Sequence, residues 1–306
     1  MTTTLQVKAP AKLNLFLHIT GRRDDGYHLL QSLFVPIALY DSLSFKLNAH
    51  GQVRRLTPNA TIAEDDDLVV KAARLLKAQL NRPELGVDIE LQKAIPSGAG
   101  LGGGSSDAAS TLMALNELWG LCLSKEQLLP LALKLGADVP FFLEARPAIV
   151  EGIGEHIFPL AKELSSNIAQ IHYVLFVPKL AIPTVSIFKE PSLKRDTPKL
   201  ALEQLTQELN QLEYVWQYGQ NDLEPVACAL HPALDELRQY LYALGFKVHM
   251  SGAGSVFFAA FDSKEQAEAV AQQVEESLTL LKRTAPLSQL ASLDLRCLKV
   301  SSHISQ

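Results

Sequence analysis

Cysteine, excess positive charge and long apolar runs are all scarce in this chain of 306 residues. The three cysteines, Cys122, Cys228 and Cys297, are far apart and form no Cys-x-x-Cys pair, so the sequence predicts neither a disulfide framework nor a zinc site. The net charge of −5 argues against general nucleic-acid binding, which needs a basic surface. No run is as long as a membrane span, and no secretory pattern opens the sequence. We therefore expect a cytoplasmic protein with no nucleic-acid or membrane partner.

The composition is otherwise that of a globular protein. Apolar residues make up 47% of the chain and charged residues 20%, and the length is sufficient for two domains. Strand-like patterns come first and are followed by mixed helices and strands, so we predict an α+β protein of two domains. The boundary is expected near the middle of the chain, which gives domains of residues 1–160 and 161–306.

Glycine is concentrated in one short stretch, Ile95–Ala109, which reads IPSGAGLGGGSSDAA. A strand-like run, Val87–Ile95, precedes it, and a helix-like run, Ala108–Trp119, follows with Ser105 or Ser106 as its expected N-cap. Glycines allow left-handed turns and close approach of a ligand to the backbone, and a helix N-terminus adds N–H donors. The pattern predicts a phosphate-binding loop. The alternative is a flexible surface linker.

Two common phosphate motifs do not fit this loop. A Walker P-loop needs Lys after the glycines, but Gly104 is followed by two serines. The spacing Gly98-x-Gly100-x-x-Gly103 matches the dinucleotide fingerprint formally. That fold also requires an early βαβ unit and an acid about 20 residues further on, whereas Glu117 comes too early and the preceding chain looks antiparallel. The sequence therefore disfavours a dehydrogenase.

Apolar periodicity predicts most of the remaining elements. Leu5–Ala9 and Leu13–Thr20 are expected strands separated at Pro10, and Leu29–Leu39 is an expected strand broken by Pro36. Pro130 is expected to kink or split a helix that starts with the capping box of Ser124 and Gln127 and ends near Gly136. The other expected strands are Ser42–Leu47, Ile171–Val177, Phe246–Met250 and Val256–Phe261. The other expected helices are Leu68–Leu80, Leu200–Leu212, His231–Leu244 and one opening at Ser263. Pro178–Lys199 is expected to be irregular, and the tail from Pro286 carries little pattern.

The glycine loop resembles the phosphate-binding motif of the galactokinase, homoserine, mevalonate and phosphomevalonate (GHMP) kinase superfamily. Other motifs, in the same order from about Val7 to about Phe261, resemble the branch whose substrate is a cytidyl-diphosphate sugar alcohol. They are Pro10–Leu15 (PAKLNL), Gly21–Arg23, Asp25–His28 (DGYH), Gly136–Phe142 (GADVPFF), Ile182–Thr184, Ile187–Lys189, Thr197–Lys199, Asn221–Glu224 and Ser251–Ser255.

This resemblance implies a fold and a reaction. The expected fold has an N-terminal domain like ribosomal protein S5 domain 2 and a ferredoxin-like C-terminal domain. The expected reaction is ATP-dependent phosphorylation of the 2-hydroxyl of 4-diphosphocytidyl-2-C-methyl-D-erythritol, a step of the non-mevalonate isoprenoid pathway. Mg²⁺ is expected with ATP, held mainly by phosphates and waters because the sequence shows no carboxylate cage. We expect a monomer or a weak homodimer.

The resemblance also implies roles for individual residues. Asp138 would be the catalytic base or would orient the attacking hydroxyl, with Lys12 beside it stabilising the moving charge. Locally, Asp138 could instead cap a turn, and Lys12 could protect an edge strand. The residues expected to bind the ATP phosphates are Pro96, Ser97, Gly98, Ala99, Gly100, Leu101, Gly102, Gly103, Gly104, Ser105 and Ser106. The Ser251–Ser255 turn would close over them, or it is a plain hairpin turn.

Substrate recognition is expected around a tyrosine and a histidine. In the implied site Tyr27 and Phe188 stack on the two faces of cytosine, His28 reads its polar edge, and Asn14 and Thr184 contact the substrate. The alternatives are ordinary turn, strand-end and core residues. Three functional classes stay open: the cytidyl-diphosphate sugar-alcohol kinase, another small-alcohol kinase of the superfamily, and a nucleotide-binding protein without catalysis.

Overall fold

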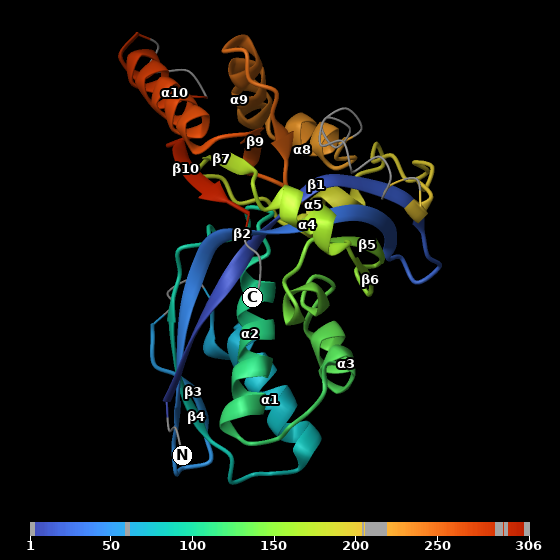
Figure 1. The fold of residues 1–306 in the computed structure, drawn as a ribbon, viewed down its shortest axis with the longest axis vertical. Coiled ribbons are helices and arrows are strands. Elements are labelled where there is room, and N and C mark those ends of the chain that lie inside the picture. The colour runs from blue at the N-terminus through green and yellow to red at the C-terminus, as the bar shows by residue number, and fades with distance from the viewer. Residues whose placement is uncertain are drawn as a thin grey trace. The chain divides into compact units, whose positions relative to one another are not determined.

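The computed structural model describes residues 4–58, 62–203, 205, 219–284, 290 and 293–302. Its mixture of helices and strands agrees with the predicted α+β class (Figure 1). Chain contacts define two compact units, and neither is one continuous segment. Unit 1 comprises Met1–Ala11, Leu39–Ile95 and Gly102–Ala145, and unit 2 comprises Lys12–Ala38, Pro96–Leu101 and Arg146–Gln306. The division into domains 1–160 and 161–306 stays a prediction.

The sheet of unit 1 is built on the second half of β2 (His28–Leu47), which pairs antiparallel with β4 (Val87–Gln92). The short strand β3 (Val53–Arg55) pairs parallel with β4. Along β2 the buried Leu43 and Phe45 alternate with more exposed residues, as expected for a strand with one face in the core.

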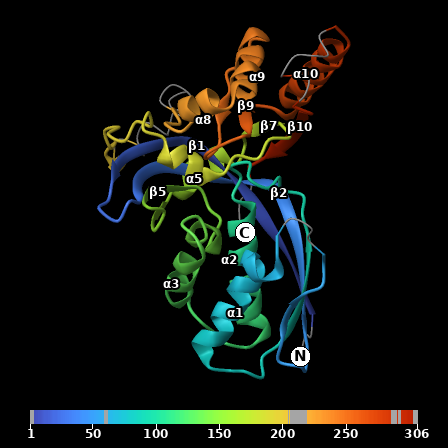
Figure 2. The ribbon, with the colours of Figure 1, turned by 180° about the vertical axis from the view of Figure 1, so that it is seen from behind.

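In the part of unit 1 that the structure describes, three α-helices follow the 3₁₀ turn η1 (Glu64–Asp66) and precede η2 (Pro140–Leu143). They are α1 (Leu68–Leu80), α2 (Gly103–Leu118) and α3 (Lys125–Leu135). The first two lie against each other in both Figure 1 and Figure 2. The expected capping box of Ser124 and Gln127 is present, but α3 continues through Pro130 instead of splitting there.

In unit 2 the first half of β2 pairs antiparallel with β5 (Ala148–Gly152), which pairs with β6 (His156–Pro159). A second sheet has the order β10-β7-β9-β8. Its strands are β7 (His172–Val177), β8 (His249–Met250), β9 (Phe257–Phe261) and β10 (Arg296–Ser301). Among its described residues, the helices of this unit are α4 (Lys162–Ile168), α5 (Thr184–Lys189), α8 (Glu224–Leu230), α9 (Pro232–Ala243) and α10 (Lys264–Thr284).

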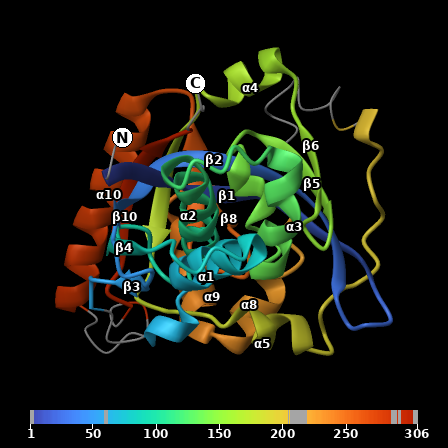
Figure 3. The ribbon, with the colours of Figure 1, turned by 90° about the horizontal axis from the view of Figure 1, so that it is seen from below.

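The core of unit 2 joins this sheet to the first strand of the chain. Phe176 and Phe257 on the sheet are fully buried, and Leu17 and Ile19 of β1 (Thr4–Arg22) belong to the same hydrophobic cluster. Helix α10 packs against β10 and β7, and Figure 3 shows it beside β10. Residues of the N-terminal strand therefore help to form the unit that contains most of the C-terminal half. None of the helices in the described ranges has both the length and the apolarity needed to cross a membrane.

Two expected strand breaks at proline are wrong. Strand β1 runs through Pro10, and β2 runs through Pro36 and includes the separately expected Ser42–Leu47. A proline in a strand removes one N–H donor, but its φ near −65° lies within the extended region. A proline at a position that needs no donor does not end the strand.

Other element predictions missed an element or gave it too great a length. Helix α5 lies within the segment expected to be irregular, and β10 lies in the tail that carries little pattern. The expected strand Phe246–Met250 is reduced to the two residues of β8. Most of the expected helix Leu200–Leu212 lies outside the described residues.

Candidate active site

The glycine loop uses glycine where the backbone requires it. Gly98, Gly100 and Gly102 have φ of 64°, 77° and 70°, values that residues with a Cβ rarely adopt. Gly103 is already helical, because α2 begins there and Gly102 is its N-cap. The expected N-cap role of Ser105 or Ser106 is therefore wrong.

The first part of this loop, Pro96–Leu101, belongs to unit 2, where main-chain and side-chain groups hold its carbonyl oxygens. Ile182 N donates to Gly98 O at 3.2 Å, and Val256 N donates to Ala99 O at 3.4 Å. The donors to the next two carbonyls are Lys12 Nζ on Gly100 O (2.9 Å) and Lys12 N on Leu101 O (3.0 Å). Fixing four consecutive carbonyls fixes the peptide planes, and therefore the directions of the N–H groups that would bind phosphate.

Lys12 and Asn14, two neighbours on one face of β1, are both buried and in contact. The Lys12 ammonium donates to the Asn14 side-chain oxygen and lies 5.0 Å from the centre of the Phe34 ring. Asn14 Nδ2 donates to Ser32 Oγ at 3.0 Å. A buried ammonium is tolerated only where its donors are satisfied, so this network fixes a positive charge against the loop carbonyl of Gly100.

The second glycine turn, Ser251–Ser255, packs directly against the glycine loop within unit 2. A Cβ on Gly100 would lie 1.9 Å from Ser251 O, and a Cβ on Gly252 would lie 3.1 Å from Gly100 Cα. Ser251 Oγ donates to Gly100 O at 2.9 Å. The two backbones can approach this closely only because both segments have glycine there.

Asn221 also holds the second turn through its side-chain amide. Its Nδ2 group donates to Met250 O and Gly252 O, both at 2.8 Å, and its Oδ1 accepts from Leu223 N at 3.0 Å. Sequence reasoning placed Asn221 in a motif without a role. Its role becomes visible only in the structure, where the amide is buried and therefore needs several hydrogen-bond partners.

The start of α2 in unit 1 carries the two serines of the loop. Ser106 Oγ is fully buried and has no hydrogen-bond partner among the described residues, while Ser105 is partly exposed. A buried hydroxyl without a partner is uncommon in native structures. Because it lies in the first turns of α2, at the end of the glycine loop, this hydroxyl is a candidate for contact with a ligand.

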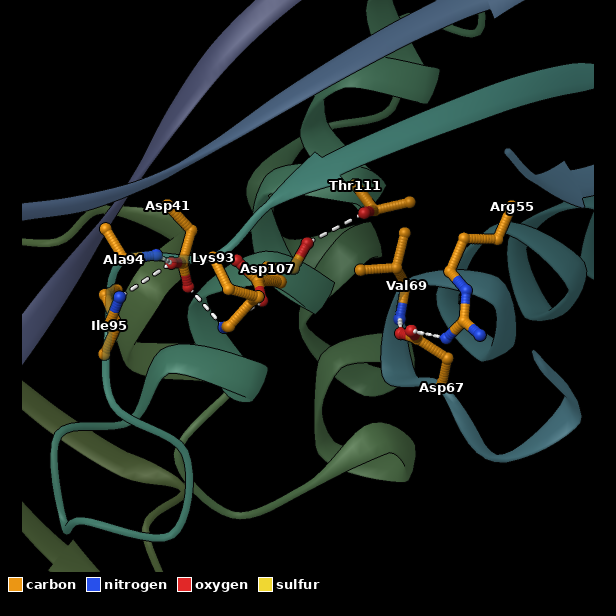
Figure 4. Close-up of polar contacts among 9 residues, drawn as sticks. All are labelled: Asp41, Arg55, Asp67, Val69, Lys93, Ala94, Ile95, Asp107 and Thr111. Carbon is orange, nitrogen blue, oxygen red and sulfur yellow. Dashed lines mark hydrogen bonds and ion pairs between the residues drawn. The ribbon is translucent and has the colours of Figure 1, made fainter. Parts of the chain in front are cut away.

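A lysine and two aspartates, which sequence reasoning missed, lie beside the start of α2 (Figure 4). The ammonium of Lys93 pairs with Asp41 and, at 2.7 Å, with Asp107 Oδ2. Asp41 Oδ1 also accepts from the main-chain N–H groups of Ala94 (2.6 Å) and Ile95 (2.9 Å). Asp41 therefore fixes the chain where it leaves β4 and enters the glycine loop.

Two of the three charged side chains in this cluster, Asp107 and Lys93, have shifted pKa values. Burial raises the pKa of Asp107 to about 7; Lys93 opposes the rise and Asp41 adds to it. The pKa of Lys93 is also raised, because the two carboxylates outweigh the effect of its burial. Only contacts between residues far apart in the chain reveal this cluster.

Asp138 lies between the end of α3 and η2, where it is partly exposed among the buried side chains of Val139 and Phe141. It belongs to unit 1, whereas Lys12 belongs to unit 2. The expected proximity of Asp138 and Lys12 stays a prediction.

The expected base-recognition residues lie in unit 2. Tyr27 is exposed in the turn before β2, and its N–H donates to Asp25 Oδ1 at 3.2 Å. The rings of His28 and Phe188 are in contact, with centroids 4.9 Å apart and an interplanar angle of 35°. Thr184 is exposed at the first position of α5. The structure thus brings His28 and Phe188 together.

Two family models match this chain, GHMP kinases N terminal domain over residues 67–146 and GHMP kinases C terminal over residues 199–279. The chain belongs to the GHMP kinases, which are ATP-dependent phosphotransferases that act on alcohol groups, and the predicted GHMP kinase fold is confirmed. Two relatives bear the name 4-diphosphocytidyl-2-C-methyl-D-erythritol kinase. The one from Ralstonia pickettii (strain 12J) is 44% identical over 87% of this chain and 88% of its own. The one from Burkholderia pseudomallei (strain 668) is 46% identical over 85% and 87%.

Solved structures agree with this family. A 4-(cytidine 5'-diphospho)-2C-methyl-D-erythritol kinase is 33% identical with a TM-score of 0.73, over 98% of this chain and 100% of that one. A homoserine kinase from Cytophaga hutchinsonii ATCC 33406 has a TM-score of 0.71 at 19% identity, over 100% of this chain and 96% of that one. The second likeness concerns the fold alone.

Proposed function

We propose that this chain transfers the γ-phosphoryl group of ATP to the 2-hydroxyl of 4-diphosphocytidyl-2-C-methyl-D-erythritol. The observation that carries the chemistry is the buried Lys12 ammonium, which is held by Asn14 and by the carbonyl of Gly100 within the glycine loop. A fixed positive charge beside a phosphate-binding loop stabilises the charge that develops during phosphoryl transfer. The substrate is the one that the relatives' name specifies.

The remaining catalytic roles rest on the resemblance of the chain's motifs to those of the family. Asp138 would accept or orient the proton of the attacking hydroxyl, and Asn14 would hydrogen-bond the substrate near Lys12. Most of the catalytic effect in phosphoryl transfer comes from positioning and electrostatics, so orientation by Asp138 is the main part of its proposed role.

ATP would bind along Pro96–Ser106, with its phosphates on the loop N–H groups and the N-terminus of α2. Among the described residues no cluster of three His, Cys, Asp or Glu side chains could hold a metal ion. Mg²⁺ would therefore be bound mainly by the ATP phosphates and water, and it would neutralise phosphate charge. The unpartnered hydroxyl of Ser106 fits contact with either the ion or a phosphate oxygen.

Tyr27, His28 and Phe188 would bind the cytosine, and Thr184 would contact the substrate nearby. Tyr27 offers an exposed ring, and the ring of Phe188 is held against His28. Aromatic stacking on a base contributes about 1–3 kcal/mol, enough to favour a nucleotide-linked substrate over a bare alcohol. The proposal includes a cytoplasmic monomer or weak homodimer.

The proposal is tested by measuring ATP consumption with three acceptors: the cytidyl-diphosphate substrate, mevalonate and homoserine. We expect turnover with the first and none above background with the others. Turnover with mevalonate or homoserine in its place would favour the alternative, another small-alcohol kinase of the GHMP family. ATP binding without turnover of any alcohol would favour a nucleotide-binding protein without catalysis.

A further inference from the structure

Arg195 lies in the segment after α5, and its hydrogen bonds go to neutral groups. Its Nη atoms donate to the carbonyl oxygens of Phe188 (3.2 Å), Glu190 (2.6 Å), Pro191 (3.3 Å) and Leu193 (2.8 Å). Its Nε donates to Nε2 of His28 at 3.0 Å. Among the described residues no carboxylate forms an ion pair with this guanidinium. Arg195 therefore donates only to nearby main-chain carbonyls and to one imidazole among the described residues.

This contact determines which nitrogen of His28 carries a proton. A guanidinium keeps all its protons in proteins, so His28 Nε2 has to accept through its lone pair. A neutral imidazole has a single N–H, which must then be on Nδ1. Burial lowers the pKa of His28, and the positive charges of Arg195 and Arg22 lower it further. The ring is therefore neutral at neutral pH, with Nδ1 as a donor.

The same guanidinium also fixes the neighbour of the imidazole. Arg195 binds the carbonyl of Phe188, whose ring packs on His28 with centroids 4.9 Å apart. One side chain thus holds the main chain of Phe188 and donates to Nε2 of the histidine that its ring contacts.

We propose that Arg195 is a positioning residue for base recognition, which holds His28 in the tautomer whose Nδ1–H faces the base as a donor. This inference rests on the proposed function, in which His28 reads the edge of a cytidine diphosphate group. Cytosine has an acceptor at N3, whereas uracil has an N–H at the same position. A fixed donor pairs with the first and opposes the second. The other tautomer would place a lone pair on Nδ1 and reverse this preference.

The test is calorimetric binding of CDP and of UDP to the full chain at pH 8.0 and pH 5.5. Wild type should prefer CDP at both values, because Nδ1 carries a proton both in the neutral ring held by Arg195 and in the imidazolium. Arg195→Met frees Nε2, so both tautomers form at pH 8.0 and the preference for CDP should fall roughly tenfold, the usual effect of a mismatched buried hydrogen bond. At pH 5.5 the imidazolium of the variant donates from both nitrogens, so the preference should return toward wild type.

A matched control is Arg22→Met. Arg22 contributes charge near His28, but its hydrogen bond goes to Gly26 O at 3.3 Å, so the CDP preference at pH 8.0 should not change. The ¹⁵N shifts of the His28 ring provide a second readout. They should report protonated Nδ1 and unprotonated Nε2 in wild type and mixed tautomers in Arg195→Met.

Two results would overturn the inference. One is an unchanged tautomer and preference in Arg195→Met, and the other is an equal loss of preference at both pH values, which would indicate a purely structural clamp. Failure of the proposed function looks different. In that case wild type would bind CDP and UDP equally, or His28→Ala would keep the preference for CDP.

Discussion

Asp107 is a buried carboxylate whose titration affects the stability of the fold. Its pKa is raised by burial to about 7, although Lys93 lies 2.7 Å away. Between the ordinary pKa of Asp and about pH 7, the folded protein keeps a proton that the unfolded chain has lost. The contribution of Asp107 to the free energy of unfolding therefore falls as pH rises through this window.

This gives a prediction for Asp107→Asn, which removes the titrating group. The stability of wild type relative to the variant should decrease by on the order of 2 kcal/mol between pH 5 and pH 8. Urea unfolding of both proteins at both pH values measures this difference in the free energy of unfolding. A difference that is constant with pH, or that changes in the opposite direction, would show that Asp107 ionises normally.

The role of Asp138 can be tested by a single substitution. Asp138→Ala should lower turnover by at least about 10²-fold, since a group that positions or accepts a proton contributes about 10²–10⁴-fold. ATP affinity should stay close to that of wild type, because the phosphates are proposed to lie on the glycine loop. Turnover and calorimetric ATP binding are measured on the same preparation. Turnover at the wild-type level would remove Asp138 from the mechanism.

At the scale of elements, the glycine loop is defined by its contact with the Ser251–Ser255 turn. Gly100→Ala should lower both stability and ATP affinity, because its Cβ would lie 1.9 Å from Ser251 O. The matched control is Gly120→Ala, at a similar φ of 63° but with open space around the Cβ. The control should show only the cost of a left-handed conformation, about 1–2 kcal/mol.

The two variants are compared by urea unfolding and by ATP titration. Gly100→Ala should lose clearly more stability than Gly120→Ala and should also bind ATP more weakly. Equal losses of stability with unchanged ATP binding would mean that the close packing of the two glycine segments contributes neither to stability nor to ATP affinity. Gly103 is helical, and a Cβ there would lie 2.9 Å from Ile95 Cγ2 and 3.2 Å from Lys93 Nζ, so a substitution at Gly103 would test packing at the start of α2 as well as phosphate binding.

Elements with strong periodicity or caps were predictable, and those defined by distant contacts were not. Helix α1 has the bounds that its apolar periodicity predicts. Its N-cap Asp67 accepts from Val69 N at 2.9 Å (Figure 4). Strand β10 has little pattern of its own and is fixed by pairing with β7. Prolines misled the strand predictions, because their effect depends on which N–H groups the partner strand needs.

At the scale of the whole molecule, the chain is divided into units that sequence order does not reveal. β1 and β2 each contribute residues to both units, and the division into domains 1–160 and 161–306 stays a prediction. The candidate site was predictable where one motif carries it, as in the glycine loop and Lys12. Asp41, Lys93 and Arg195 were not, because the Lys93–Asp41 pair and the contact of Arg195 with His28 join residues far apart in the sequence.

The central claim is that this GHMP kinase phosphorylates the 2-hydroxyl of a cytidyl-diphosphate methylerythritol. The most direct test is ³¹P NMR of a reaction containing the full chain, ATP, Mg²⁺ and this substrate. We predict equal amounts of ADP and of a new phosphomonoester, with the ¹H and ¹³C shifts placing the phosphate on the 2-oxygen and the cytidine diphosphate intact. ADP without a phosphomonoester, or a phosphate on another hydroxyl, would contradict the proposal.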